Sequence, residues 1–313
     1  MFAIFAAAFT NWFCIYFMSA ERALEGNTSV MVKVKEFARL MKLRLASLVV
    51  FSAGVTYVTA ADTINWSILI WVLIGGLLVT GAANGYNQVI EQETDKLMAR
   101  TANRPLPIGT LNTFEGLAFC SVIGAAGIVL LWTQVNMLSA ILGLLAIVLY
   151  ALVYTPMKKV SPLAVFVGAF PGALPTMIGW VAADGDITIG AWTMFAIQFI
   201  WQFPHFWSIA WILHDDYEKA GFKMMPTAGG RTSASAIQMV IYSLFLVPMG
   251  FLPYWLGLTG ITSAIIAVVA ALLFTYQAYK LLKQLDVPAA KRLMFASIIY
   301  LPVVQLAYMF DKI

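Results

Sequence analysis

The chain has 313 residues, of which 61% are hydrophobic and only 11% are charged. This composition excludes an ordinary soluble domain. The net charge of +4 is not gathered into a basic stripe with interleaved aromatic side chains, so no nucleic-acid partner is expected. No charge-rich insertion separates a second folded unit. The sequence therefore predicts one polytopic domain that lies in a lipid bilayer.

An apolar segment precedes this domain. Residues 1–18 lack the basic start and the small-residue cleavage site of a signal peptide. We predict that residues 1–30 form an accessory hydrophobic segment without a catalytic role, and that residues 31–313 form the functional domain. The alternatives for the segment are an extra membrane span, an interfacial helix, or sequence upstream of a true start at Met18 or Met31.

Nine apolar stretches are long enough to cross a hydrocarbon core, which needs about 20 helical residues. They cover residues 45–62, 67–90, 114–132, 137–154, 163–182, 188–213, 236–256, 259–280 and 291–310. The predicted fold class is therefore an all-α polytopic membrane protein with about nine transmembrane helices.

Lysine and arginine indicate the topology of these spans. Seventeen of the 19 fall in alternate loops, at residues 33–44, 96–104, 158–159, 219–231 and 280–292. Basic loops are retained on the cytoplasmic side of a membrane. The sequence therefore places these loops inside and, with nine spans, the C-terminus outside.

The segment 84–109 carries the strongest chemical signal. Asn87, Glu91 and Asp95 are spaced four residues apart at the end of an apolar run, so on a helix they form one polar stripe. Carboxylates beside hydrocarbon are costly unless they are compensated. Hard oxygen ligands suit Mg²⁺, which commonly bridges to substrate phosphates, and the guanidinium groups of Arg100 and Arg104 match phosphate oxygens. The pattern predicts a diphosphate site.

Other polar residues in the basic loops are predicted to join this site. They are Lys42 and Arg44 before the first span, Tyr154 and Lys158 at the end of the fourth, and Asp215 and Asp216 after the sixth. We expect Lys42 and Arg44 to bind the diphosphate, as we expect of Arg100 and Arg104. The alternative for each is an ordinary interfacial or solvated residue.

His205 is an imidazole deep in the sixth span, directly after Pro204. A polar group at this depth is functional by default. About three helical turns separate it from Asp216, so we expect the two residues on one face. A neutral imidazole could ligate iron and a protonated one could contact a carboxylate. A structural histidine is the alternative.

At these positions the chain resembles the heme O synthases (protoheme IX farnesyltransferases), a branch of the UbiA superfamily of intramembrane prenyltransferases. The similarity extends from Lys42 to Tyr308. It rests on N-x-x-x-E-x-x-x-D from Asn87, M-x-R-T-x-N-R-P-L-P from Met98, Y-T-P-M-K-K from Tyr154, W-Q-F-P-H-F-W from Trp201 and D-D-Y-x-x-A-G-x-x-M-x-P from Asp215. The acidic stripe alone indicates the superfamily, and the other motifs narrow the resemblance to this branch.

The resemblance implies helices around a central cavity, where two acidic motifs hold Mg²⁺ against a prenyl diphosphate. Many relatives carry D-x-x-x-D after the sixth span. Here Leu213 and Tyr217 occupy the two acidic positions, and Asp215 and Asp216 lie between them, so the choice within this pair stays open. The expected metal ligands are Glu91, Asp95, Asp215 and Asp216.

The same resemblance implies farnesyl transfer from farnesyl diphosphate to a vinyl group of heme B, with addition of water, at the cytoplasmic side of a bacterial-type inner membrane. A downstream heme-modifying membrane enzyme is an expected partner. The expected catalytic residues are Asn87, Glu91, Asp95, Tyr154, Lys158 and Asp216, with His205 on the heme.

Two other functions compete with heme farnesylation. The first is prenylation of a quinone or another aromatic acceptor, which predicts no dependence on an iron porphyrin. The second is a transporter or heme-handling protein. A permeation path predicts polar groups in both membrane halves, whereas here they gather at one face.

Overall fold

The computed structural model describes residues 29–313. Apart from its last two residues, the predicted accessory segment 1–30 lies outside the described part of the chain. Residues 29–313 are almost entirely helical and contain no β-strand beyond one isolated bridge between Thr259 and Lys312.

The described chain contains long helices joined by short loops. These are α3 (Leu43–Ala60), α4 (Trp66–Ile90), α6 (Thr113–Gln134), α7 (Met137–Val148) with its continuations η1 (Leu149–Tyr154) and α8 (Thr155–Val160), α9 (Ala164–Asp184), α10 (Ile189–Ile212), α12 (Ser233–Trp255), α13 (Ile261–Gln284) and α14 (Val287–Phe310). Three shorter helices are α2 (Ser29–Met41), α5 (Gln92–Asp95) and α11 (His214–Lys219).

Eight helices of the described chain are long and apolar enough to cross a membrane, where α7, η1 and α8 count as one helix. The ninth long helix, α10, has 24 residues, but Gln198, Gln202 and His205 lower its mean hydropathy. The chain is therefore an all-α integral membrane protein, as the apolar stretches predict.

Polar capping residues determine where several of these helices begin. The Asn65 side chain accepts hydrogen bonds from the backbone N–H groups of Ser67 and Ile68 at the start of α4. Asn112 and Glu115 form a reciprocal capping box at the start of α6. Because the first N–H groups of a helix have no partner within it, such caps stabilise its start by about 1 kcal/mol each.

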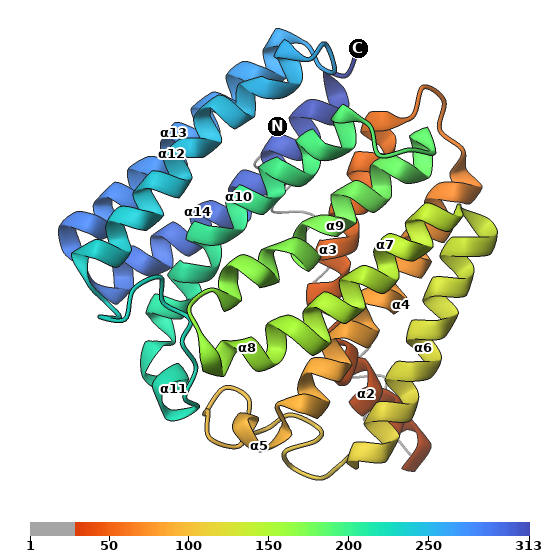
Figure 1. The fold of residues 1–313 in the computed structure, drawn as a ribbon, viewed down its shortest axis with the longest axis vertical. Coiled ribbons are helices and arrows are strands. Elements are labelled where there is room, and N and C mark those ends of the chain that lie inside the picture. The colour runs from red at the N-terminus through yellow and green to blue at the C-terminus, as the bar shows by residue number, and fades with distance from the viewer. Residues whose placement is uncertain (1–28) are drawn as a thin grey trace.

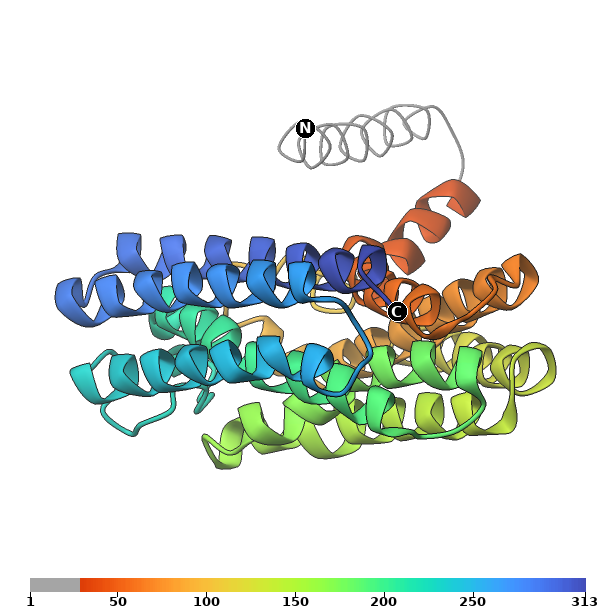
Figure 2. The same cartoon turned by 90° about the horizontal axis from the view of Figure 1, so that it is seen from above.

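The helices pack side by side (Figures 1 and 2). α12, α13 and α14 lie at one side of the bundle, α4 and α6 at the other, and α9 and α10 between them. α3 approaches α9 so closely that a Cβ atom on Gly179 would lie 2.0 Å from the carbonyl oxygen of Ala53. The short helices α2, α5 and α11 gather at one end of the bundle (Figure 1).

A chain of buried amides connects four helices inside the bundle. The Ser52 hydroxyl donates to Gln305 Oε1 at 3.2 Å, and Gln305 Nε2 donates to Gln198 Oε1 at 2.9 Å. Gln198 Nε2 in turn donates to the carbonyl oxygen of Gly172 at 2.7 Å. Hydrogen bonds of this kind stabilise membrane bundles by about 0.6 kcal/mol each. They fix α3, α9, α10 and α14 relative to one another.

Candidate active site

The polar stripe of Asn87, Glu91 and Asp95 keeps its helical spacing, although α4 ends within it. α4 ends at Ile90, yet the N–H of Glu91 still donates to the Asn87 carbonyl at 3.0 Å, and the N–H of Asp95 donates to the Glu91 carbonyl at 2.7 Å. The four-residue spacing therefore keeps its helical geometry. Asn87, Glu91 and Asp95 are 2%, 5% and 0% exposed, so the structure places three polar groups in an enclosed environment.

Cations compensate the two buried carboxylates. Lys158 Nζ lies 2.6 Å from Glu91 Oε1, and Arg104 Nη1 lies 2.6 Å from Asp95 Oδ2. Lys42 Nζ is 3.4 Å from Asn87 Oδ1. Four segments that are distant in the sequence thus meet here: the start of α3, the end of α4, the loop after α5, and α8. Sequence spacing gave no indication of which cation pairs with which acid.

A π-helical turn positions Lys158. In η1 the backbone N–H of Thr155 donates to the carbonyl of Tyr150, five residues back. Such turns occur frequently at functional sites. The turn directs the Lys158 ammonium over the ring of Tyr154, 4.9 Å from its centroid, and Phe222 lies on another side at 5.2 Å. These aromatic faces stabilise the cation.

Thr155 also orients Asn87. The Asn87 side-chain NH₂ donates to Thr155 Oγ1 at 3.1 Å, and the Thr155 hydroxyl donates to the Tyr150 carbonyl at 2.7 Å. The amide oxygen of Asn87 is thereby turned toward Lys42. Thr155 was not predicted from the sequence, although it lies inside the Y-T-P-M-K-K motif.

The backbone at Lys42 is held in the left-handed region, with φ 51° and ψ 53°. This conformation costs a non-glycine residue about 1–2 kcal/mol. Two buried amides of α4 hold the break between α2 and α3: Asn84 Nδ2 donates to the Met41 carbonyl at 3.1 Å, and Gln88 Nε2 donates to the Leu40 carbonyl at 2.7 Å. Neither amide was predicted from the sequence, although two amides four residues apart in an apolar span were a usable signal.

Burial alters the charges of the cluster. It lowers the pKa of Lys42 to about 7, and the nearby Arg104 and Lys158 act in the same direction while Glu91 and Asp95 oppose them. Burial also raises the pKa of Asp95, against the effect of Arg104. An enclosed group of cations that repel one another is suited to receive an anion.

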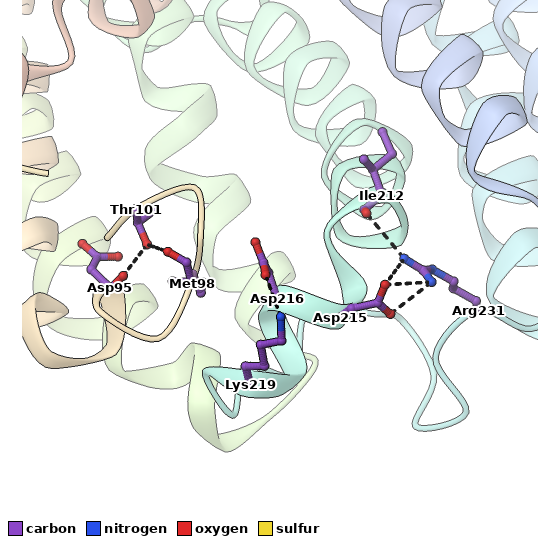
Figure 3. Close-up of polar contacts among 8 residues, drawn as sticks. All are labelled: Asp95, Met98, Thr101, Ile212, Asp215, Asp216, Lys219 and Arg231. Carbon is purple, nitrogen blue, oxygen red and sulfur yellow. Dashed lines mark hydrogen bonds and ion pairs between the residues drawn. The ribbon is translucent and has the colours of Figure 1, made fainter. Parts of the chain in front are cut away.

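The loop between α5 and α6 brings Arg104 back to Asp95. The buried Thr101 hydroxyl donates to the backbone carbonyl of Asp95 at 2.8 Å, which closes the turn (Figure 3). Arg100 in this loop is exposed. Burial raises the pKa of Tyr217 on α11, and the positive charge of Arg100 opposes that rise. Arg44 is exposed on α3 and makes no polar side-chain contact with the described residues. The structure does not bring Arg44 into the cluster.

The two acids of α11 point in different directions (Figure 3). Asp215 is paired with Arg231, with Oδ1 and Nη1 3.1 Å apart, and Arg231 Nε also donates to the Trp211 carbonyl at 2.8 Å. Asp216 lies on the side of α11 nearer to Asp95, 3.5 Å from Lys219 Nζ. Within residues 29–313 no three acidic, histidine or cysteine side chains form a ready metal cluster. The ion pairs of the α11 acids in this part of the chain are with Lys219 and Arg231.

The α4–α5 pair nevertheless fits Mg²⁺. Asp95 Oδ1 is buried and has no hydrogen-bond partner among the described residues. Mg²⁺ is usually bound by one or two carboxylates together with substrate phosphates. Glu91 and Asp95 supply the carboxylates, and the surrounding cations suit the phosphates.

His205 is half-buried on α10 and contacts α14. Its Nδ1 lies 2.7 Å from the Ser297 hydroxyl, and its ring stacks on Trp201 with centroids 4.7 Å apart. α10 ends at Ile212, before α11 begins at His214. His205 and Asp216 therefore lie on separate helices, but the N–H of Leu213 donates to the Ile209 carbonyl and the N–H of Tyr217 to the Leu213 carbonyl, both at 2.9 Å, as happens across the break between α4 and α5. The shared face of His205 and Asp216 stays a prediction.

Fold and site together define an integral membrane protein with an enclosed acid–cation cluster at one end. The model of the UbiA prenyltransferase family matches residues 47–299. The "Protoheme IX farnesyltransferase" of Cytophaga hutchinsonii is 48% identical over 278 residues, which cover 88% of this chain and 97% of that one. The protein of the same name from Christiangramia forsetii is 43% identical over 94% of this chain and 98% of its own.

Solved structures share the fold. One, described as digeranylgeranylglyceryl phosphate synthase, superposes with a TM-score of 0.75 at 20% identity, covering 89% of this chain and 98% of that one. A UbiA homolog from Archaeoglobus fulgidus, bound to GPP and Mg²⁺, gives a TM-score of 0.67 at 15% identity, covering 87% of this chain and 99% of its own. The chain belongs to the UbiA prenyltransferase family, within its protoheme IX farnesyltransferase group. It is a prenyltransferase.

Proposed function

We propose that this chain transfers a farnesyl group from farnesyl diphosphate to a vinyl group of heme B, with addition of water, to give heme O and diphosphate. The names of its relatives support the substrates. The observation that carries the proposal is the enclosed pairing of Glu91 and Asp95 with Lys158 and Arg104. The lysine and arginine content of the loops at this end supports a site at the cytoplasmic face of a bacterial inner membrane.

The cations of the cluster bind the diphosphate. Lys42, Lys158 and Arg104 now contact Asn87, Glu91 and Asp95. When the substrate enters, their N–H groups turn to phosphate oxygens, with Arg100 added from the exposed loop. A bidentate arginine–phosphate pair fixes the orientation of the leaving group. Glu91 and Asp95 would hold Mg²⁺, which would supply Lewis-acid neutralisation of the leaving diphosphate.

The reaction balances without a redox partner. The allylic C–O bond breaks and its electron pair leaves with the diphosphate. The π electrons of the heme vinyl group form the new C–C bond to the farnesyl carbon. Water adds to the resulting cation and loses one proton, which leaves a hydroxyethylfarnesyl group. Aromatic faces such as those of Tyr154 and Phe222, which already flank a cation in this structure, stabilise positive charge.

Asp216 is our choice for the acid that α11 contributes. It lies on the side nearer to Asp95, whereas Asp215 is held by Arg231. His205 is proposed to bind the heme. The product leaves in the membrane, where a downstream heme-modifying membrane enzyme would receive it.

One experiment tests the proposed function. Membranes with the full-length protein are incubated with heme B, farnesyl diphosphate and Mg²⁺, and mass spectrometry detects hydroxyethylfarnesyl heme. The Glu91→Gln variant serves as the inactive control. Parallel incubations replace heme with metal-free protoporphyrin or a quinone. Farnesylation of the quinone with no farnesylated heme would overturn the assignment of the acceptor.

A further inference from the structure

Helix α2 packs against the loop that carries Arg104. This loop, residues 96–112, connects α5 to α6. Leu106 and Leu111 of the loop are buried, and they share an apolar cluster with the buried Leu40 of α2. Because apolar contact has no preferred direction, it keeps the loop on α2 without fixing the orientation of any one peptide unit. That orientation has to come from polar contacts.

The peptide unit between Asn103 and Arg104 is hydrogen-bonded at both of its polar groups. Its carbonyl oxygen accepts a hydrogen bond from Nη2 of Arg39 on α2. Its N–H donates to the carbonyl of Thr101 at 3.0 Å. The Thr101 hydroxyl donates in turn to the backbone carbonyl of Asp95 at 2.8 Å. The backbone at Arg104 is therefore fixed from α2 on one side and from Asp95 on the other.

Glu36 holds the guanidinium group of Arg39 in place. Both of its carboxylate oxygens lie within 3.0 Å of Arg39 Nη1, and Oε2 also lies 3.1 Å from the Thr110 hydroxyl. Glu36 is only 7% exposed. An ion pair with so buried an acid contributes little to stability, because desolvation offsets its attraction. Geometry explains the pair better, since Arg39 binds Glu36 through Nη1 and presents Nη2 to the loop.

Arg104 is the residue that depends on this arrangement. Its Nη1 lies 2.6 Å from Asp95 Oδ2, and in the proposed function it turns to phosphate oxygens. A guanidinium binds phosphate through a rigid planar fork, so its fit depends on where the backbone holds it. A displacement of about 1 Å by a distant substitution can cost ~100-fold in rate. The position of the loop backbone is thus a functional quantity.

We propose that Glu36 and Arg39 of α2 are positioning residues for Arg104, and that they direct its guanidinium to the diphosphate of the prenyl substrate. The inference rests on the proposed function, because it takes that diphosphate as the ligand of Arg104. Within residues 29–313 the polar side-chain contacts of Glu36 and Arg39 are with each other, Asn103 and Thr110. The pair therefore acts on the acid–cation cluster through the loop backbone.

Equilibrium binding of farnesyl thiodiphosphate, with Mg²⁺, to the purified full-length protein tests this positioning without the acceptor. Arg39→Gln should weaken binding ~10-fold, because the backbone at Arg104 is no longer fixed. Arg39→Lys should recover only part of the loss, since an ammonium group lacks the planar fork that binds Glu36 and Asn103 together. Unaltered affinity in Arg39→Gln would overturn the proposal.

Lys33→Gln is the matched control on the same helix. The side chains of Lys33 and Arg39 are 41% and 42% exposed. Lys33 also donates to a carbonyl of the loop, but to that of Thr110 at 3.2 Å, six residues after Arg104. Lys33→Gln should therefore leave the affinity unchanged. Equal weakening by Lys33→Gln and Arg39→Gln would mean that α2 only attaches the loop, and it would overturn the proposal.

A double-mutant cycle separates positioning from a general loss of folded protein. In Arg104→Gln the fork is absent, while the new amide can still donate to Asp95. In that background Arg39→Gln should weaken binding by no more than ~2-fold, because there is no guanidinium left to position. A merely structural role would repeat the full ~10-fold loss, and this additivity would overturn the proposal.

The two hypotheses fail differently. If the analogue binds with these dependences but no farnesylated heme forms in the membrane assay, the proposed function fails and the positioning of Arg104 stands. If farnesylated heme forms and Arg39→Gln binds the analogue as tightly as the wild type does, the proposed function stands and the positioning fails.

Discussion

Two acid-bearing segments approach each other at the basic end of the molecule, and they differ in how their charges are held. Glu91 and Asp95 are buried and each contacts a cation at 2.6 Å. Asp215 and Asp216 lie on a six-residue helix that has no buried residue. A backbone hydrogen bond of 2.7 Å, from the N–H of Lys223 to the carbonyl of Lys158, ties the loop after this helix to α8, which carries the ion-pair partner of Glu91.

The difference indicates a division of roles. A buried ion pair is weak evidence for stability, because desolvation offsets its attraction. The α4–α5 acids are therefore better explained by chemistry than by folding. The α11 acids, of which Asp215 is exposed and Asp216 is half-buried, carry a smaller desolvation cost than the buried pair, which suits a segment that completes the site when substrate arrives. Four predictions test this division.

The largest effect is expected in the buried pair. Glu91→Gln and Asp95→Asn should each lower turnover ~10²–10³-fold, because an amide lacks the charge that complements Mg²⁺ and the diphosphate. Product formation is measured by mass spectrometry at saturating Mg²⁺. Glu93→Gln is the matched control, since Glu93 is exposed and forms an ion pair with the exposed Lys96. Near-wild-type turnover in either buried variant would contradict the metal site.

Arg104→Ala should destabilise the protein by about 3 kcal/mol, because it leaves the Asp95 carboxylate buried without a partner. Thermal unfolding in detergent measures the loss. Adding Asp95→Asn to this variant should restore stability but not activity. Arg100→Ala, at an exposed position, should leave unfolding unchanged and raise the KM for farnesyl diphosphate more than that for heme. Unaltered stability of Arg104→Ala would mean that the carboxylate is compensated in another way.

Substitutions of the two α11 acids should have different effects. Asp216→Asn should lower turnover ~10-fold and raise the Mg²⁺ concentration that is required, because it lies on the side of Asp95. Asp215→Asn should match Arg231→Ala, with a small loss of stability and little change in Mg²⁺ requirement. A larger loss of turnover and a higher Mg²⁺ requirement in Asp215→Asn than in Asp216→Asn would exchange the roles of the two residues.

The smallest effect concerns pH. With its pKa lowered to about 7, Lys42 is charged below pH 7 and increasingly neutral above it. A bound diphosphate favours the charged form, so binding takes up a proton above pH 7 and the affinity for farnesyl diphosphate should fall about 3–10-fold between pH 6.5 and 8.5. Lys42→Arg should remove this component, since arginine stays charged. Identical pH profiles of the wild type and Lys42→Arg would mean that a group other than Lys42 causes the pH dependence of farnesyl diphosphate binding.

The sequence predicted what depends on local periodicity. Nine apolar runs gave the long helices within a few residues, and the four-residue spacing of Asn87, Glu91 and Asp95 gave a shared stripe. These features depend on hydrophobicity and helical repeat alone.

Tertiary pairings could not be derived in this way. The partner of Glu91 is Lys158, 67 residues later, and only the packing of α4 on η1 and α8 brings them together. The roles of Asn84 and Gln88 depend on carbonyls released at a helix break that the sequence does not mark. For Asp215 the deciding contact is Arg231, which the motif comparison did not include.

The π-helical turn at Leu149–Tyr154 has a consequence for how this family can change. One residue more than an α-helix needs is held within the span, so deleting one residue of this turn would restore the α-helical repeat and leave Lys158 facing Glu91, whereas deleting Pro156 or Met157 after the turn would rotate Lys158 by about 100° away from Glu91. The lipid-facing half of the helix would remain intact. The turn therefore tolerates loss of its extra residue, whereas a single-codon deletion between the turn and Lys158 should give a folded protein that lacks the proposed catalytic lysine.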